Sequence, residues 1–109
     1  MLLPLLLIVG CSKPISEETL IDKDGLYTEW YENGQKESEE TFKDGKRDGL
    51  GTWWYENGQK KIKGINKDGR RDGLWTWWYE NGQKKSEGKN KDGKLISSKT
   101  WNKDGSVKE

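Results

Sequence analysis

The sequence predicts an all-β protein, a single-layer antiparallel β-meander in which repeated hairpins build an elongated twisted sheet. The first observation is that 14 glycines, one methionine and no alanine disfavour a helical bundle. The second is that only 29% of the 109 residues are apolar, too few for two packed layers. Disordered chains are poor in aromatic residues, whereas this chain has seven Trp, four Tyr and one Phe. The third is a 24-residue repeat, visible in the Asp-Gly-Leu triplets that begin at Asp24, Asp48 and Asp72.

Residues 1–10 form the first predicted element, a lipoprotein signal peptide. Eight of these residues are apolar and none is charged. The stretch is shorter than the ~20 residues that span a bilayer, but it matches the apolar region of a secretory signal. The segment Ile8-Val9-Gly10-Cys11 resembles a bacterial lipobox, which implies cleavage before Cys11 and diacylglycerol on its sulfur. The alternative is a buried N-terminal strand with an incidental cysteine.

Residues 11–21 are then expected to form a lipidated tether that holds the domain at the membrane through the lipid on Cys11. Localisation in a bacterial cell envelope follows. Ser12, rather than Asp, comes after the cysteine, which by analogy favours the outer membrane in a Gram-negative cell. Cys11 is the only cysteine, so the chain has no intramolecular disulfide.

Residues 22–109 form the predicted repeat domain. Each unit consists of a strand, a tight turn, a second strand and a loop. In the second unit the strands are expected at 50–55 and 60–66. We expect a type I′ turn at Asn57-Gly58, and we place Lys67-Asp68-Gly69 in a longer loop that ends at Gly73. The units are residues 24–47, 48–71 and 72–95, with a shorter, degraded unit at 96–109.

Alternation along the first strand of each unit divides its residues between two faces. One face repeats without change: Leu26, Thr28 and Trp30 recur as Leu50, Thr52 and Trp54, and as Leu74, Thr76 and Trp78. The other face varies: Tyr27, Glu29 and Tyr31 become Gly51, Trp53 and Tyr55, then Trp75, Trp77 and Tyr79. Counting outward from the turn pairs Tyr55 with Lys60, Trp54 with Lys61 and Trp53 with Ile62. Lysine stems are expected to lie over indole rings and so to replace a second layer.

The core Tyr-Glu-Asn-Gly-Gln, at Tyr31, Tyr55 and Tyr79, and the Lys-Asp-Gly loops resemble the MORN-type repeat. More specifically, the repeat resembles the variant found in bacterial YwqK-type antitoxins. The resemblance implies a binding or scaffolding module, with an antitoxin or immunity role as one alternative. Cell-wall (choline-type) binding repeats, which are also short aromatic hairpins, are a second alternative.

Catalytic chemistry has little support in the sequence. The chain has no histidine and its one cysteine is expected to carry lipid, which excludes His/Cys metal sites and Ser-His or Cys-His nucleophile pairs. Neighbouring Glu39 and Glu40 are interpreted as part of a solvated face. We therefore expect no catalytic residue, no metal and no cofactor.

Charge is distributed unevenly although the net charge is only +1. Residues 12–59 hold 6 basic and 12 acidic side chains, whereas residues 60–95 hold 11 basic and 5 acidic ones. This polarity either solubilises the surface or lets the basic, Trp-rich half bind an anionic partner.

The prediction is a non-enzymatic, lipid-anchored module that binds a protein or an envelope component. We expect no nucleic-acid partner, because a secreted lipoprotein rarely meets one. Trp30, Trp54 and Trp78 are interpreted as structural. The candidate binding face consists of Tyr27, Trp53, Tyr55, Trp75, Trp77, Tyr79, Lys60, Arg70, Arg71 and Lys84.

Overall fold

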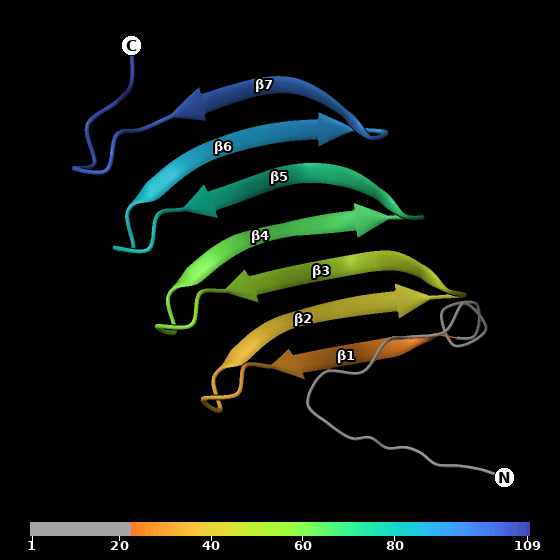
Figure 1. Cartoon of the computed structure of the whole chain (residues 1–109). Coiled ribbons are helices and arrows are strands. Elements are labelled where there is room, and N and C mark those ends of the chain that lie inside the picture. The colour runs from red at the N-terminus through yellow and green to blue at the C-terminus, as the bar shows by residue number, and fades with distance from the viewer. Residues whose placement is uncertain (1–22) are drawn as a thin grey trace, which may run out of the picture.

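The computed structural model describes residues 23–109, which form one open, twisted sheet (Figure 1). The predicted signal peptide, Cys11 and the tether lie outside the described residues. Every strand pairs antiparallel with its sequence neighbours, in the order β1-β2-β3-β4-β5-β6-β7, so the predicted single-layer meander is confirmed. The strands are β1 (Gly25–Trp30), β2 (Lys36–Lys43), β3 (Lys46–Trp54), β4 (Lys60–Lys67), β5 (Arg70–Trp78), β6 (Lys84–Lys91) and β7 (Lys94–Thr100).

The Asp-Gly turns are tighter than the sequence suggested. Asp68 and Gly69 have φ of 52° and 83°, and the flanking Lys67 and Arg70 are strand partners. Two central residues with positive φ make a type I′ turn, so the predicted longer loop up to Gly73 is wrong. Arg70 to Gly73 instead belong to β5, which pairs with the end of β4.

The Asn-Gly turns are the longer ones, and the predicted type I′ geometry is wrong there. In the second unit Gly58 N–H donates to the Tyr55 carbonyl at 3.0 Å, and Tyr55 N–H donates to the Gln59 carbonyl at 2.8 Å. Only Gly58 has positive φ, whereas Asn57 does not. This is the three-residue hairpin loop, in which a type I turn is followed by a left-handed glycine. Asn57 Oδ1 accepts from Gln59 N–H at 2.9 Å and closes the loop.

A bulge after each Asn-Gly turn changes the predicted strand register. Trp53 pairs with Ile62 as expected, but Trp54 pairs with Lys60. The predicted pairs Trp54–Lys61 and Tyr55–Lys60 are wrong, because Lys61 is the extra residue of the bulge. The same shift recurs where Trp30 pairs with Lys36 and Trp78 pairs with Lys84.

One side of the sheet, which we call the ladder face, carries Trp30, Trp54 and Trp78. Lys36 Nζ lies 5.7 Å from the centroid of the Trp54 ring, and Lys60 Nζ lies 5.7 Å from that of Trp78. Strand pairing and these contacts therefore alternate Trp with Lys from unit to unit. Each lysine covers the indole of the following unit, which confirms that lysine stems cover indole rings.

The Tyr-Glu-Asn-Gly segment bonds each unit to the next along the Asn-Gly edge. Tyr31 and Tyr55 donate their hydroxyls to the carbonyls of Trp54 and Trp78, each at 2.6 Å. Tyr79 does the same to Trp101, at 2.8 Å, so the degraded last unit keeps this contact. Contacts between neighbouring units are therefore what extends the sheet.

Candidate binding surface

The opposite side of the sheet, which we call the cluster face, carries Trp53, Trp75 and Trp77. The ring centroids of Trp53 and Trp75 are 6.1 Å apart, as are those of Trp75 and Trp77. Trp75 is the most buried aromatic residue described, with 3% of its surface exposed, and its Nε1 donates to the Ile65 carbonyl at 2.9 Å. Trp53 and Trp77 flank it and are half-buried, so part of each ring is open to solvent.

Glycine provides the floor on which Trp75 lies. A Cβ at Gly64, the strand partner of Trp75, would lie 2.1 Å from the Trp75 ring. That distance is far below van der Waals contact, so only glycine at this position lets the indole lie flat on β4. The close approach buries Trp75 without a second layer of structure.

A guanidinium covers the cluster from the solvent side. The Arg71 guanidinium carbon lies 4.9 Å from the Trp75 ring centroid and 5.3 Å from that of Trp77. Such stacking leaves the N–H groups at the rim of the guanidinium available for hydrogen bonds. Next to it is a hollow of about 290 Å³, lined by Arg47, Trp53, Ile62, Asn66, Gly69, Arg71 and Trp75.

The sequence-predicted binding residues do not all share this face. Tyr27 lies on it but at the β1 end, where its ring meets Phe42 edge-on at 5.6 Å. Lys60 and Lys84 lie over ladder-face indoles, and Lys84 also pairs with Glu87 at 2.6 Å. Arg70 belongs to the pair that flanks a type I′ turn and does not line the hollow. The structure thus brings together Trp53, Trp75, Trp77 and Arg71, and whether they bind a partner stays a prediction.

Tyr55 and Tyr79 are also apart from the cluster, because their hydroxyls are used in bonds between units. Burial, followed by the nearby Glu80 carboxylate, raises the pKa of Tyr55. Burial, then Glu37 and Glu56, likewise raises the pKa of Tyr31. Tyr31 and Tyr55 therefore remain protonated donors at neutral pH, which suits a structural role.

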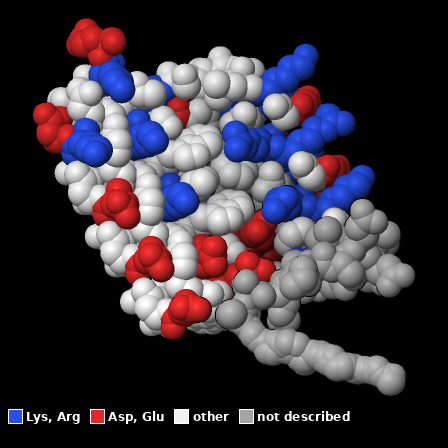
Figure 2. Space-filling model, in the orientation of Figure 1, with Lys and Arg blue, Asp and Glu red and all other residues white. Residues whose placement is uncertain are grey.

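The charge polarity predicted from the sequence is visible on the surface. Figure 2 shows acidic side chains along the left edge and over the lower strands, and basic side chains over the upper strands and the right edge. Glu40 lies at the acidic end and pairs with Arg47, whereas Arg71 takes part in none of the three ion pairs among residues 23–109. Arg71 is thus the cation over the cluster that has no carboxylate partner in this part of the chain.

Two features were missed by reasoning from sequence. The first is the Glu40–Arg47 pair, which joins two strands and which a residue-by-residue comparison of the 24-residue units could have indicated. The second is a row of exposed aliphatic side chains on the ladder face. Its members are Leu26, Leu50, Ile65 and Leu74, each between 47% and 64% exposed. Their regular spacing was visible, but their exposure depends on the sheet having no second layer.

Other kinds of site find little support in residues 23–109. This part of the chain contains no group of three or more His, Cys, Asp or Glu side chains that could hold a metal ion. It also contains no helix long and apolar enough to cross a membrane.

Comparison with known families identifies the repeat. The family model of the MORN repeat variant matches residues 23–44, 47–65 and 71–92, more than half of the chain. The chain belongs to this family. The three matches fall one in each predicted unit, which supports a MORN-repeat protein of the kind the resemblance implied. Searches of curated proteins and of solved structures gave no match.

Membership in this family bears on function only coarsely. MORN repeats are modules often involved in binding, and the family is generally non-catalytic. The open sheet agrees with such a role, because it offers two broad surfaces for contact.

Proposed function

We propose that this MORN-repeat protein is a non-enzymatic, lipid-anchored module that binds a protein partner through its cluster face. The observation that carries the proposal is the cluster itself, in which half-buried Trp53 lines a hollow beside Arg71 and half-buried Trp77 lies under the Arg71 guanidinium. Trp and Arg are the side chains most often found at energetically important positions of protein interfaces. The ladder face has a different role in this proposal, because the indoles of Trp54 and Trp78 are already covered by lysines of the preceding units.

The anchor in this proposal is the lipid on Cys11. Its support is the apolar stretch of residues 1–10 and the lipobox-like segment that ends at Cys11. Two or three acyl chains give durable attachment at about 0.8 kcal/mol per buried methylene. The sheet would then stand in the cell envelope, at the outer membrane in a Gram-negative cell.

Affinity capture from the native host tests the binding face. The full lipoprotein serves as bait beside the double variant Trp53→Ala/Trp77→Ala and the matched control Leu50→Ala/Leu74→Ala. The control removes apolar side chains from the ladder face. We expect the first variant to lose the partner and the control to keep it. Equal recovery by all three baits, or loss only in the control, would contradict the proposed face.

Capture also decides between a scaffold and the antitoxin alternative. Both use the same surface and differ in the partner that is recovered. A toxin whose activity the bait suppresses would establish the antitoxin role, whereas a component of envelope assembly would establish the scaffold.

The anchor is tested by Cys11→Ser in the full-length chain. We expect the variant to leave the membrane fraction and to lose metabolic lipid labelling. Continued labelling of the variant would refute the lipoprotein prediction and leave the binding face untouched.

A further inference from the structure

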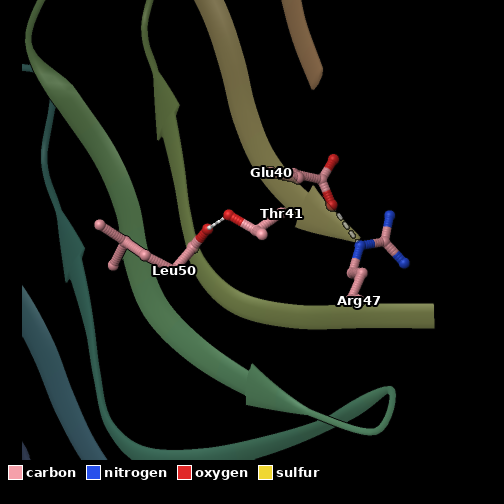
Figure 3. Close-up of polar contacts among 4 residues, drawn as sticks. All are labelled: Glu40, Thr41, Arg47 and Leu50. Atoms are coloured by element: carbon pink, nitrogen blue, oxygen red, sulfur yellow. Dashed lines mark hydrogen bonds and ion pairs between the residues drawn. The ribbon is translucent and has the colours of Figure 1, made fainter. Parts of the chain in front are cut away.

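The β2–β3 hairpin shows how a carboxylate is bound on the cluster face. Arg47 Nε donates to Glu40 Oε1 across β2 and β3, as Figure 3 shows. Arg47 is also the strand partner of Phe42, and its guanidinium carbon lies 5.7 Å from the Phe42 ring centroid. Glu40 faces Gly51 on β3, where the outer end of the Trp53 ring lies over the glycine. Arg47 thus contacts a carboxylate and an aromatic ring at the same time.

The β4–β5 hairpin has an arginine at the equivalent position but lacks the carboxylate. Twenty-four residues after Glu40 the chain has Gly64, and 24 residues after Arg47 it has Arg71. Twenty-four residues after Gly51 the chain has Trp75. Arg71 therefore stacks on the rings of Trp75 and Trp77, and among residues 23–109 it has no ion-pair partner.

The hollow between these two hairpins combines both arginines. Arg47 and Arg71 line it together with the apolar walls of Trp53 and Ile62. A guanidinium that stacks on a ring still presents a planar pair of N–H donors, which matches the two oxygens of a carboxylate. The volume of about 290 Å³ is sufficient for a carboxylate side chain and one apolar neighbour.

We propose that this hollow binds a Glu or Asp side chain on an extended segment of a protein partner, with Arg71 as the carboxylate-binding residue. The ligand carboxylate pairs with Arg71 as Glu40 pairs with Arg47. An apolar side chain two residues along, on the same face of the extended segment, packs on Trp53 and Ile62. The excess of basic residues in 60–95 attracts the acidic segment. This inference rests on the proposed function, since it names the chemistry that the cluster face recognises.

The test is the affinity of the mature protein for a labelled Glu–Phe peptide with the repeat Glu-Ser-Phe-Ser, in which Glu and Phe share one face of an extended chain, measured by fluorescence anisotropy. We expect Arg71→Ala to raise Kd about tenfold, which corresponds to about 1.4 kcal/mol. The matched control is Arg70→Ala, which removes the same charge from the adjacent residue, outside the hollow. Arg70→Ala should leave Kd within about twofold, because the pairing depends on geometry as well as on net charge.

A gain of affinity gives the sharper result. Glu40→Gln removes the carboxylate that occupies Arg47 and so provides a second free guanidinium at the hollow. We expect this variant to lower Kd about threefold, because another charge-assisted hydrogen bond becomes available. A purely structural role of these residues would not increase affinity. Near-ultraviolet circular dichroism confirms that each variant keeps its aromatic packing.

Several outcomes would overturn the inference. Equal losses in Arg71→Ala and Arg70→Ala would indicate a diffuse charge effect, and an unchanged Kd in Glu40→Gln would remove Arg47 from the site. Equal binding of the peptide with Gln in place of Glu would exclude the carboxylate. Binding only to vesicles of anionic lipid or to polygalacturonate would assign the surface to a different ligand class. Should the peptide fail while capture still depends on Trp53 and Trp77, only this inference fails and the proposed function stands.

Discussion

The two faces of this sheet differ in how faithfully they repeat. On the ladder face Trp30, Trp54 and Trp78 recur every 24 residues, and a lysine of the preceding unit covers the second and third of these indoles. On the cluster face the equivalent positions change from unit to unit, as where Glu29 becomes Trp53 and then Trp77. Side chains that join one unit to the next must be present in every unit. The positions that change are free of this requirement, and two of them, Trp53 and Trp75, line the hollow.

The middle unit, residues 48–71, differs in charge from the first unit. Lys36 pairs with Glu39 at 2.5 Å and Lys84 pairs with Glu87 at 2.6 Å, but the equivalent of these glutamates in the middle unit is Lys63. Glu40 is likewise replaced by Gly64. These two replacements remove two carboxylates and add one cation, so the middle unit contributes strongly to the basic half of the chain.

The largest expected effect is that of truncating Trp75 on the cluster face, compared with truncating Trp30 on the ladder face. Trp75→Ala should reduce the free energy of unfolding by about 3–5 kcal/mol, because it leaves a cavity at the most buried aromatic position. Trp30→Ala should cost below about 1 kcal/mol, because Trp30 is 58% exposed at the end of the ladder. Urea denaturation measures both values. A larger loss for Trp30 would reverse the comparison between the faces.

A methyl group on the floor of the cluster should have the next largest effect. Gly64→Ala is expected to cost about 2 kcal/mol or more, since its Cβ would overlap the central ring atoms of Trp75. Gly51→Ala is the matched control, because its nearest contact is the outer end of the Trp53 ring at 2.9 Å, which can swing away. The control should cost less than about 1 kcal/mol. Similar urea midpoints for the two variants would show that Trp75 has another place to pack.

Loss of one bond between units should have a smaller effect. Tyr55→Phe removes the hydroxyl that donates to the Trp78 carbonyl at 2.6 Å and should cost about 1 kcal/mol. Asn57→Ala removes the 3.0 Å bond to the Glu80 carbonyl and the 2.9 Å bond from Gln59 N–H, but both are exposed, so it should cost less because water can replace them. Thermal denaturation ranks the two variants.

The smallest expected effect is the pH dependence of stability that arises from the tyrosines joining neighbouring units. The pKa values of Tyr31 and Tyr55 are raised in the folded protein, mainly by burial. A raised folded-state pKa favours the protonated hydroxyl, so its contribution is complete below the unfolded-state pKa of about 10 and is lost above it. Stability should therefore fall as pH rises past about 10. Tyr31→Phe/Tyr55→Phe should show a shallower alkaline decrease, measured by urea denaturation along a pH series.

Much of the fold could be predicted from the sequence because its period is visible. The 24-residue repeat gave the strand order, and alternation placed Trp53 and Trp54 on opposite faces, as observed. The turn types could not be assigned in this way, because Asn-Gly and Asp-Gly both tolerate positive φ. Loop length depends on which flanking residues pair. In the sequence, Arg70 to Gly73 have the polar composition of a loop. In the structure they belong to β5, where Arg70, Arg71 and Asp72 pair with β4.

The candidate site was less predictable than the fold. Choosing Trp53, Trp75, Trp77 and Arg71 required only alternation and charge, but those criteria also selected Lys60 and Lys84 on the ladder face. Bulges caused this error, because an extra residue such as Lys61 moves the next side chain to the other face. The burial of Trp75 depends on Gly64, a contact between strands that no local pattern reveals.

The most direct test of the account is a nitrogen–proton correlation spectrum of the seven tryptophan indole N–H groups, recorded with and without the Glu–Phe peptide. The signals of Trp53 and Trp77 should shift as the peptide binds, and those of Trp30, Trp54 and Trp78 should stay in place. Shifts confined to Trp30, Trp54 and Trp78 would place binding on the ladder face. That result would contradict the account in which the cluster face binds the partner and the ladder face joins the units.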